Sequence, residues 1–319
     1  MLKRMSIRKI MVSTLALFAL LLLYIMPDAK EDNSYSLSTN NIEYIYDNTK
    51  EVIYTLDKNN YIARTTIKGC NCNTEEKIKN IIETIEIEGK NSNNIPNGFR
   101  AILPEGTEVL NIDLKDKVLT INFSKELLDI KEEYEEKMIE SLIYTLTSIE
   151  GIDKIIIKVE GKTLSKLPKS KKILKTVLDK SYGINKIYDI TYPTNIDMYT
   201  LYYVSKYNNE EYYVPVTKYV NNENKDKIKV IINELSTSPT YENNLMSYLN
   251  SNTNLINYNL DNDTLILNFD NSIYNNNKNI LEEVVYTISL SFNDNYNIKE
   301  VIFKANDEEI YKKNTKTIE

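Results

Sequence analysis

Two pairs of acidic residues come closest to a catalytic pattern in this sequence. Asp113 and Asp116 flank one predicted hairpin turn, and Asp261 and Asp263 flank another. Paired carboxylates act as acid and base in glycoside hydrolysis. Aspartate is also common in hairpin turns, because its side chain hydrogen-bonds to the local backbone. Asp113 corresponds to Asn259, 146 residues later, so the pairs do not mirror each other and we interpret them as solvated turn residues.

The composition gives little support to other catalytic arrangements. The 319 residues include no histidine, which excludes Ser-His and Cys-His pairs. No Ser-x-x-Lys sequence lies in a convincing turn, and the 7 glycines do not form a phosphate-binding loop. We therefore predict that the protein is not an enzyme, that it uses no cofactor, and that it has no catalytic, cofactor-binding or metal-binding residues.

Three further groups of side chains have a structural as well as a functional interpretation. The only cysteines, Cys70 and Cys72, are compatible with a disulfide, free thiols or a partial metal site. An acidic run is interpreted as the solvated face of a helix, with a partner-binding face as the alternative. Clustered tyrosines are interpreted as sheet packing rather than sugar stacking. The acidic run is Glu132, Glu133, Glu135, Glu136 and Glu140, and the tyrosines are Tyr202, Tyr203, Tyr212, Tyr213 and Tyr219.

A long internal repeat organises the elements that carry these residues. Val118 to Phe123 is echoed 146 residues later by Thr264 to Phe269, and Lys77 to Ile82 is echoed 150 residues later by Lys227 to Ile232. A period of this length indicates two tandem domains, because solenoid repeats run about 20 to 50 residues. The length of 319 residues is sufficient for two hydrophobic cores.

Each copy is predicted to follow the order β-β-α-β-β-α-β, an α+β fold in which two helices cover one small mixed sheet. The first copy is predicted to contain strands 51–56 and 61–68, helix 73–87, hairpin 109–123, helix 135–149 and strand 154–159. The second is predicted to contain strands 199–205 and 212–219, helix 225–235, a hairpin across 261–263, helix 279–290 and strand 299–304. The register between the long helices stays open, because Tyr144 matches Tyr286 at an offset of 142 rather than 146.

The N-terminal sequence indicates how the protein is attached to the membrane. Residues 10–26 are uncharged and largely apolar, and they follow a basic arm, residues 1–9, that contains no acid. We predict an uncleaved transmembrane anchor with the arm in the cytoplasm and the domains outside. A cleaved signal peptide is the alternative, although the sequence after Met26 is a poor cleavage site.

The predicted organisation is a cytoplasmic arm (1–9), a transmembrane anchor (10–26), a flexible tether (27–42), a first domain (43–168), a connecting strap (169–197), a second domain (198–313) and a tail (314–319). The strap begins with a basic run and is expected to pack on one domain. The formal net charge of -7 argues against nucleic acid or acidic lipid as the main partner.

Several short motifs mark the first copy and the strap. They are Leu103-Pro104-Glu105-Gly106-Thr107, the strand end Asn122-Phe123-Ser124, the helix Ser141 to Thr147 and the strand Ile155 to Gly161, with Gly183-Ile184-Asn185 in the strap. Together these motifs resemble the GerMN domain of sporulation and spore germination proteins. The second copy is degraded, since Leu249-Asn250-Ser251-Asn252-Thr253 replaces the first motif. The family typically carries a lipid-anchored cysteine near the N-terminus, and this chain departs from that pattern.

The resemblance implies two tandem domains similar to the ring-building motifs of secretion systems. It also implies a non-enzymatic role in assembling the channel complex between mother cell and forespore, with proteins of the channel or engulfment complex as partners. The domains would then occupy the space between the two membranes, on a single-pass membrane protein. The alternative function is binding or hydrolysis of cortex peptidoglycan during germination.

Overall fold

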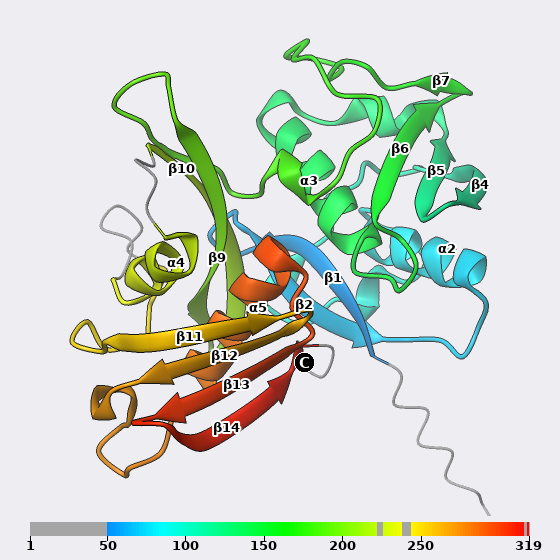
Figure 1. Cartoon of the computed structure of the whole chain (residues 1–319). Helices are drawn as coiled ribbons and strands as arrows, with labels where there is room; N and C mark the ends of the chain where they lie inside the picture. Colours follow the sequence, from blue (N-terminus) through cyan, green and yellow to red (C-terminus); the bar gives the residue numbers. More distant parts are fainter. Residues whose placement is uncertain (1–49, 222–225, 238–243, 316–317, 319) are drawn as a thin grey trace, which may run out of the picture. The chain divides into compact units, whose positions relative to one another are not determined.

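The computed structural model describes residues 50–221, 226–237, 244–315 and 318, which belong to one compact unit beginning at Asp47 (Figure 1). The predicted arm, anchor and tether lie outside the described residues. Within the described ranges, no helix combines the length and apolar character that a transmembrane span requires.

The predicted helices and strands are confirmed in both halves, with shifted ends. The first half contains β1 (Lys50–Asp57), β2 (Ile62–Lys68), α2 (Thr74–Ile85), β3 (Phe99–Arg100), β4 (Val109–Lys115), β5 (Val118–Phe123), α3 (Glu135–Leu146), β6 (Lys154–Val159) and β7 (Lys162–Thr163). After β8 (Ile187–Asp189), the second half contains β9 (Ile196–Tyr207), β10 (Glu210–Asn221), α4 (Lys227–Leu235), β11 (Leu255–Asp261), β12 (Thr264–Phe269), α5 (Glu282–Tyr296), β13 (Glu300–Ala305) and β14 (Glu308–Asn314). The short strands β3, β7 and β8 and the edge strand β14 were not predicted.

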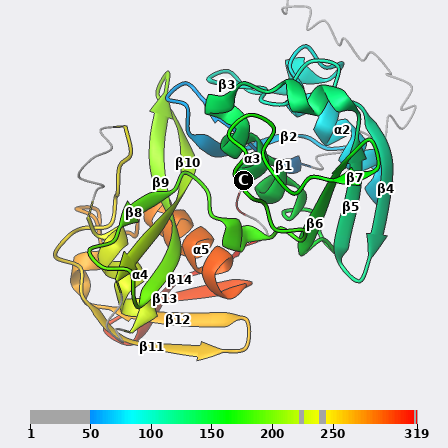
Figure 2. The same cartoon turned by 90° about the horizontal axis from the view of Figure 1, so that it is seen from above.

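Each copy contains a small mixed sheet, as predicted, but the first hairpin of the copy does not belong to it. The second hairpin of each copy builds a four-stranded sheet, β4-β5-β6-β7 in the first half and β11-β12-β13-β14 in the second (Figure 2). The first hairpins instead join a sheet that both halves share, in the order β3-β1-β2-β10-β8 with β9 also on β10. Strand β2 meets β10 antiparallel, with Arg64 opposite Tyr213.

Two hairpin turns place both of their central residues at positive φ. The turn between β4 and β5 is Asp116-Lys117, with φ of 50° and 61°. The turn between β9 and β10 is Asn208-Asn209, with φ of 48° and 68°. Two-residue hairpin turns of this kind match the right-handed twist of the flanking strands.

Helix side chains settle the open register between the two copies. The backbone N–H of Tyr54 in β1 donates to Thr145 Oγ1 of α3 at 2.9 Å. The N–H of Tyr202 in β9 donates to Ser291 Oγ of α5 at 2.9 Å. Thr145 and Ser291 are therefore equivalent, 146 residues apart. The two hydroxyl groups accept hydrogen bonds from backbone N–H groups at the outer edges of β1 and β9. Without them, these N–H groups would be buried without a partner.

Two hydrophobic clusters fill the halves and meet at the shared sheet. Equivalent strand residues dominate them, such as Ile121 in the first cluster and Leu267 in the second, both 0% exposed. Tyr202 and Val204 of the second half nevertheless belong to the first cluster, and Ala63 of the first half belongs to the second. The halves therefore share part of their cores.

The expectation that the strap packs on one domain is wrong. Leu178 pairs with Ile155 of β6 in the first half. Strand β8 pairs in parallel with β10 of the second half, with Ile187 opposite Lys218. The strap thus contacts both halves. The sequence pattern of the strap alone could not indicate these two contacts.

Candidate functional site at the junction of the two halves

The acidic pairs weighed as catalytic groups lie at hairpins. Asp113 sits on β4 opposite Thr120, and Asp116 occupies the turn. Asp263 forms an exposed ion pair with Lys299 at 2.7 Å, and this lysine lowers the pKa of the aspartate. Asp261 accepts a hydrogen bond from the side chain of its neighbour in the turn. Asp116 and Asp263 thus lie in the turns and Asp261 lies beside one, as interpreted, whereas Asp113 lies within strand β4. The described part of the chain contains no group of three or more His, Cys, Asp or Glu residues able to hold a metal ion.

The acidic run on α3 does not form a uniform solvated face, and that interpretation is wrong for Glu135 and Glu140. Glu135 is 0% exposed, and its carboxylate accepts hydrogen bonds from the backbone N–H groups of Lys169 and Ser170. Glu140 is 3% exposed. The reason is that the strap returns over the outer face of the helix and covers these two positions. The carboxylates then satisfy strap groups that would otherwise be buried without partners.

Glu140 fixes the strap by a buried ion pair and a backbone hydrogen bond. Its Oε1 lies 2.9 Å from Lys186 Nζ, and both side chains are under 10% exposed, at 5% and 9%. Its Oε2 accepts from the N–H of Asn185 at 2.9 Å. Burial raises the pKa of Glu140, and the ammonium group of Lys186 opposes that shift. Removing one partner of such a pair would leave an uncompensated buried charge.

Asn185 bridges the two hairpins. Its Nδ2 donates to Ile62 O of β2 and to Pro215 O of β10, both at 2.7 Å. Its Oδ1 accepts from Ile62 N at 2.9 Å. The amide therefore uses both of its donor hydrogens and its acceptor at this position. Since each carbonyl comes from a different half, one side chain of the strap ties the halves together.

Pro215 explains why a side chain is needed there. Arg64 lies opposite Tyr213, so continuing the register places Ile62 opposite Pro215. Proline has no N–H and cannot donate to a neighbouring strand. The ladder between β2 and β10 is interrupted at this point, and the Asn185 amide supplies the missing donors and acceptor.

The two residues before Asn185 continue the junction along β10. Ile184 is 0% exposed; its N–H donates to Thr217 Oγ1 at 3.0 Å, and its carbonyl accepts from Thr217 N at 2.8 Å. Gly183 has φ of 80°, and a Cβ there would lie 3.0 Å from the Tyr219 hydroxyl. Glycine is therefore favoured by both the backbone conformation and the available space.

A buried polar cluster forms the second part of the junction. The hydroxyls of Tyr54 and Tyr202, one from each half, lie 2.9 Å apart. Tyr202 also donates to Asp294 Oδ2 at 2.7 Å, and Lys180 Nζ of the strap lies 2.5 Å from Asp294 Oδ1. Burial raises the pKa values of both tyrosines. The cluster thus connects β1, β9, α5 and the strap through hydrogen bonds.

Most of the clustered tyrosines pack inside the protein, as interpreted. Four of the five are at most 9% exposed, and the fifth stacks on Tyr188 with ring centroids 4.8 Å apart. The four are Tyr202, Tyr203, Tyr212 and Tyr213, and the fifth is Tyr219.

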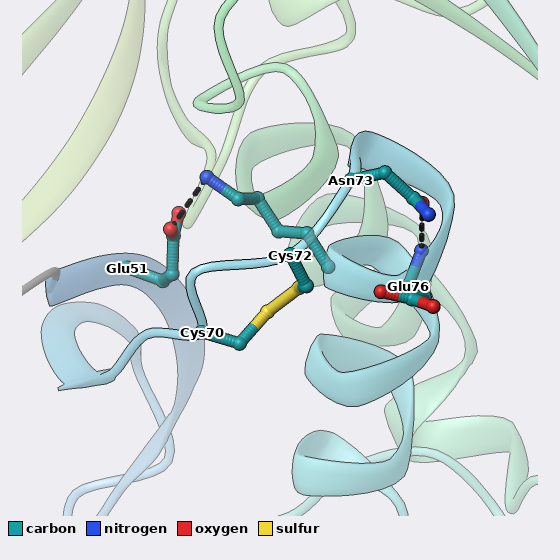
Figure 3. The surroundings of a disulfide bond; sticks show 6 residues. Glu51, Cys70, Cys72, Asn73 and Glu76 are labelled. Atoms are coloured by element: carbon teal, nitrogen blue, oxygen red, sulfur yellow. Dashed lines mark hydrogen bonds and ion pairs between the residues drawn. A yellow bond between two sulfur atoms is a disulfide. The ribbon is translucent and has the colours of Figure 1, made fainter.

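Cys70 and Cys72 are joined by a disulfide between the end of β2 and the start of α2 (Figure 3). Beside it, Lys77 Nζ lies 2.6 Å from Glu51 Oε1. As predicted, Asn73 begins the helix, and its side chain accepts from the N–H of the residue three positions on at 2.9 Å. A groove of about 210 Å³ lies here, partly lined by these groups.

In the sequence, Glu140 was interpreted as a solvated helix residue and Tyr202 as a sheet-packing residue, and no residue was predicted to join the two halves. Gly183-Ile184-Asn185 carried a usable signal, because a glycine and an asparagine that accept positive φ bracket an apolar residue, which is unusual in a solvated linker. Pro215 in the middle of a predicted strand was a second signal, since proline interrupts a ladder. Nothing in the sequence around Glu140 or Asp294 indicated that these side chains would be buried at the junction.

Comparison with known proteins extends this description. The family model described as "Germane: Sporulation and spore germination" matches residues 44–165 and 200–311. The chain belongs to this family. The resemblance found in the sequence is thereby confirmed, and the two matches fall on the two halves and leave out the whole strap.

Relatives of the Germane family match the chain across both copies. "Spore germination protein GerM" of Bacillus subtilis is 30% identical over 285 residues, which are 87% of this chain and 77% of that protein. The solved structure of the tandem GerMN domains of the sporulation protein GerM from Bacillus subtilis is similar, with a TM-score of 0.75 and 31% identity. The similarity covers 82% of this chain and 92% of that structure. Two GerMN-like α+β domains therefore make up the described chain.

Proposed function

We propose that this Germane-family protein is a membrane-anchored, non-enzymatic scaffold of sporulation that supports the channel complex between mother cell and forespore. The observation that carries the proposal is the junction, where Asn185 hydrogen-bonds to both hairpins and Tyr54 contacts Tyr202 inside a buried cluster. Such a junction holds two similar domains at a constant spacing. A scaffold needs that property, whereas two independent binding modules would not.

The duplicated domains offer two equivalent surfaces for protein partners. Strand β4 is the edge of one four-stranded sheet and β11 is the edge of the other. Leu110 and Leu114 on β4 are 47% and 41% exposed, and their counterparts Ile256 and Leu260 on β11 are 50% and 41% exposed. Both copies thus keep large apolar side chains in solvent at the same positions, beside backbone groups that can pair with an added strand.

The opposite edges of the same sheets differ from β4 and β11. Strand β7 has only 2 residues, and β14 carries Glu308, Glu309, Lys312 and Lys313. Short length and charged side chains are usual means by which proteins prevent unwanted strand pairing. Since each sheet protects one edge and leaves the other apolar, we assign partner binding to β4 and β11.

The test is a double charge substitution at equivalent edge positions, Leu114→Glu with Leu260→Glu. In sporulating cells, this variant should no longer recruit fluorescently tagged channel proteins. The purified variant should keep the circular dichroism spectrum of the unmodified protein. Tyr311→Glu is the matched control, because Tyr311 is also 41% exposed but lies on the charged edge strand β14. Normal recruitment by the double variant would overturn the scaffold proposal. Pelleting of the protein with purified sacculi would favour the peptidoglycan alternative.

A further inference from the structure

The charge of the chain is unevenly distributed. From Gly161 to Leu178 the sequence contains six lysines and no acidic residue. The formal net charge of -7 therefore divides into +6 in this segment and -13 in the remainder. The remainder of the chain is therefore expected to repel anionic partners, whereas this segment is expected to attract them.

The segment forms a hairpin that the first domain holds in place. Lys166 pairs with Ile173, and Leu167 N donates to Lys172 O at 2.9 Å. Leu167 and Leu174 are 1% and 5% exposed, so the inner side of the hairpin packs on the core. Figure 1 shows the chain running from β7 across the top of the view in this region. We call residues 165–175 the basic hairpin.

Helix α3 fixes the tip of the basic hairpin. The fully buried carboxylate of Glu135 accepts from the N–H of Ser170 at 2.9 Å and from that of Lys169. Glu136 Oε1 lies 2.9 Å from Lys172 Nζ. The hairpin is thus an ordered protrusion, and its outward side chains have defined positions.

The outward side of the basic hairpin combines lysines with one exposed aliphatic residue. Ile173 is 83% exposed, the largest fraction among the exposed large hydrophobic residues. Its cross-strand neighbour is Lys166, and Lys172 precedes it in the sequence. All five lysines of the hairpin are exposed: Lys166, Lys169, Lys171, Lys172 and Lys175.

We propose that the basic hairpin binds an anionic phospholipid surface, with Ile173 entering the interfacial region and the lysines contacting the headgroups. A protruding hairpin fits a flat surface, and clustered lysines attract acidic lipid within about a Debye length. An apolar residue surrounded by cations is the pattern of interfacial membrane binding, because burial of the side chain adds to electrostatic attraction. This inference does not depend on the scaffold role, since no partner protein is involved.

The test uses the compact unit beginning at Asp47, so that the predicted anchor cannot contribute. Sedimentation should show binding to vesicles of phosphatidylglycerol and phosphatidylcholine, no binding to pure phosphatidylcholine, and weakening with salt. The variant K169Q/K171Q/K175Q should bind roughly 100-fold more weakly, since each lysine near such a surface changes partition about fivefold. The matched control is K90Q/K229Q/K278Q, which removes the same charge from exposed lysines elsewhere.

A fluorescent probe tests insertion directly. The chain contains no tryptophan, so Ile173→Trp introduces a single reporter. Its emission should shift to shorter wavelength on anionic vesicles and should be quenched by brominated acyl chains. Equal binding by the two triple variants, or an unshifted emission of the reporter on bound vesicles, would overturn the proposal. Retention on immobilised polyglutamate without vesicle binding would also overturn it and would indicate an acidic protein partner.

Discussion

Replacing Asn185 by alanine should destabilise the junction strongly. The substitution removes three hydrogen bonds, to Ile62 N, Ile62 O and Pro215 O. Each is worth about 1 kcal/mol, and more where the backbone group stays buried without a partner. Asn185 also has φ of 45°, a conformation that costs alanine about 1 kcal/mol more. The expected loss in the free energy of unfolding is therefore about 4 kcal/mol.

Asn208→Ala is the matched control for the backbone contribution. Asn208 has φ of 48° and lies exposed in the turn between β9 and β10. Its replacement should cost only the conformational part, about 1 kcal/mol. The difference between the two variants then isolates the hydrogen bonds made by the Asn185 side chain.

Urea unfolding of the compact unit, followed by circular dichroism and tyrosine fluorescence, measures both losses. Asn185→Ala should also lower the slope of the transition or split it in two, because the halves would no longer unfold together. Equal losses for the two variants, to within about 0.5 kcal/mol, would refute the assignment of Asn185 as the residue that joins the hairpins.

Two further predictions concern buried tyrosines and the disulfide. Burial raises the pKa values of Tyr54, Tyr144 and Tyr202, so the folded state binds their phenolic protons more tightly than the unfolded state does. The contribution of these tyrosines to the free energy of unfolding is therefore complete below about pH 10 and should be lost as the pH rises further. The free energy of unfolding should fall above about pH 10, and it should fall less steeply in the variant Tyr144→Phe. An equally steep fall in that variant would show that the buried tyrosine does not cause the pH dependence. The disulfide spans a sequence separation of only 2, so replacing Cys70 and Cys72 by serine should cost about 1.5 kcal/mol in urea unfolding. A loss above about 3 kcal/mol would show that it does more than close a short loop.

Local elements were predictable because their signals are local. Alternation predicted β5 and β12, and the Asn73 cap predicted the start of α2, where the side chain accepts a backbone hydrogen bond at 2.9 Å. The helical stripe predicted α3 but not its end, which comes at Leu146 rather than near 149. Helix ends depend on capping and packing, and these vary more than periodicity does.

The pairing of whole hairpins was not predictable from the same signals. Nothing in the alternation of β1 and β2 distinguishes pairing within one domain from pairing with the other copy. The buried glutamates show the same limit, because Glu135 and Glu140 fit the polar side of α3 until the strap covers them. Long-range contacts of this kind add burial without changing the local pattern.

The helix hydroxyls and the interrupted ladder together explain why the two copies join as they do. Thr145 and Ser291 hydrogen-bond along the outer edges of β1 and β9, which leaves β2 and β10 as the edges available to each other. Full pairing between these edges is prevented by Pro215, and Asn185 of the strap completes it. A duplicated domain with these two edges free would be exposed to pairing with other molecules. The strap therefore does more than connect the copies, because it directs the free edges toward each other.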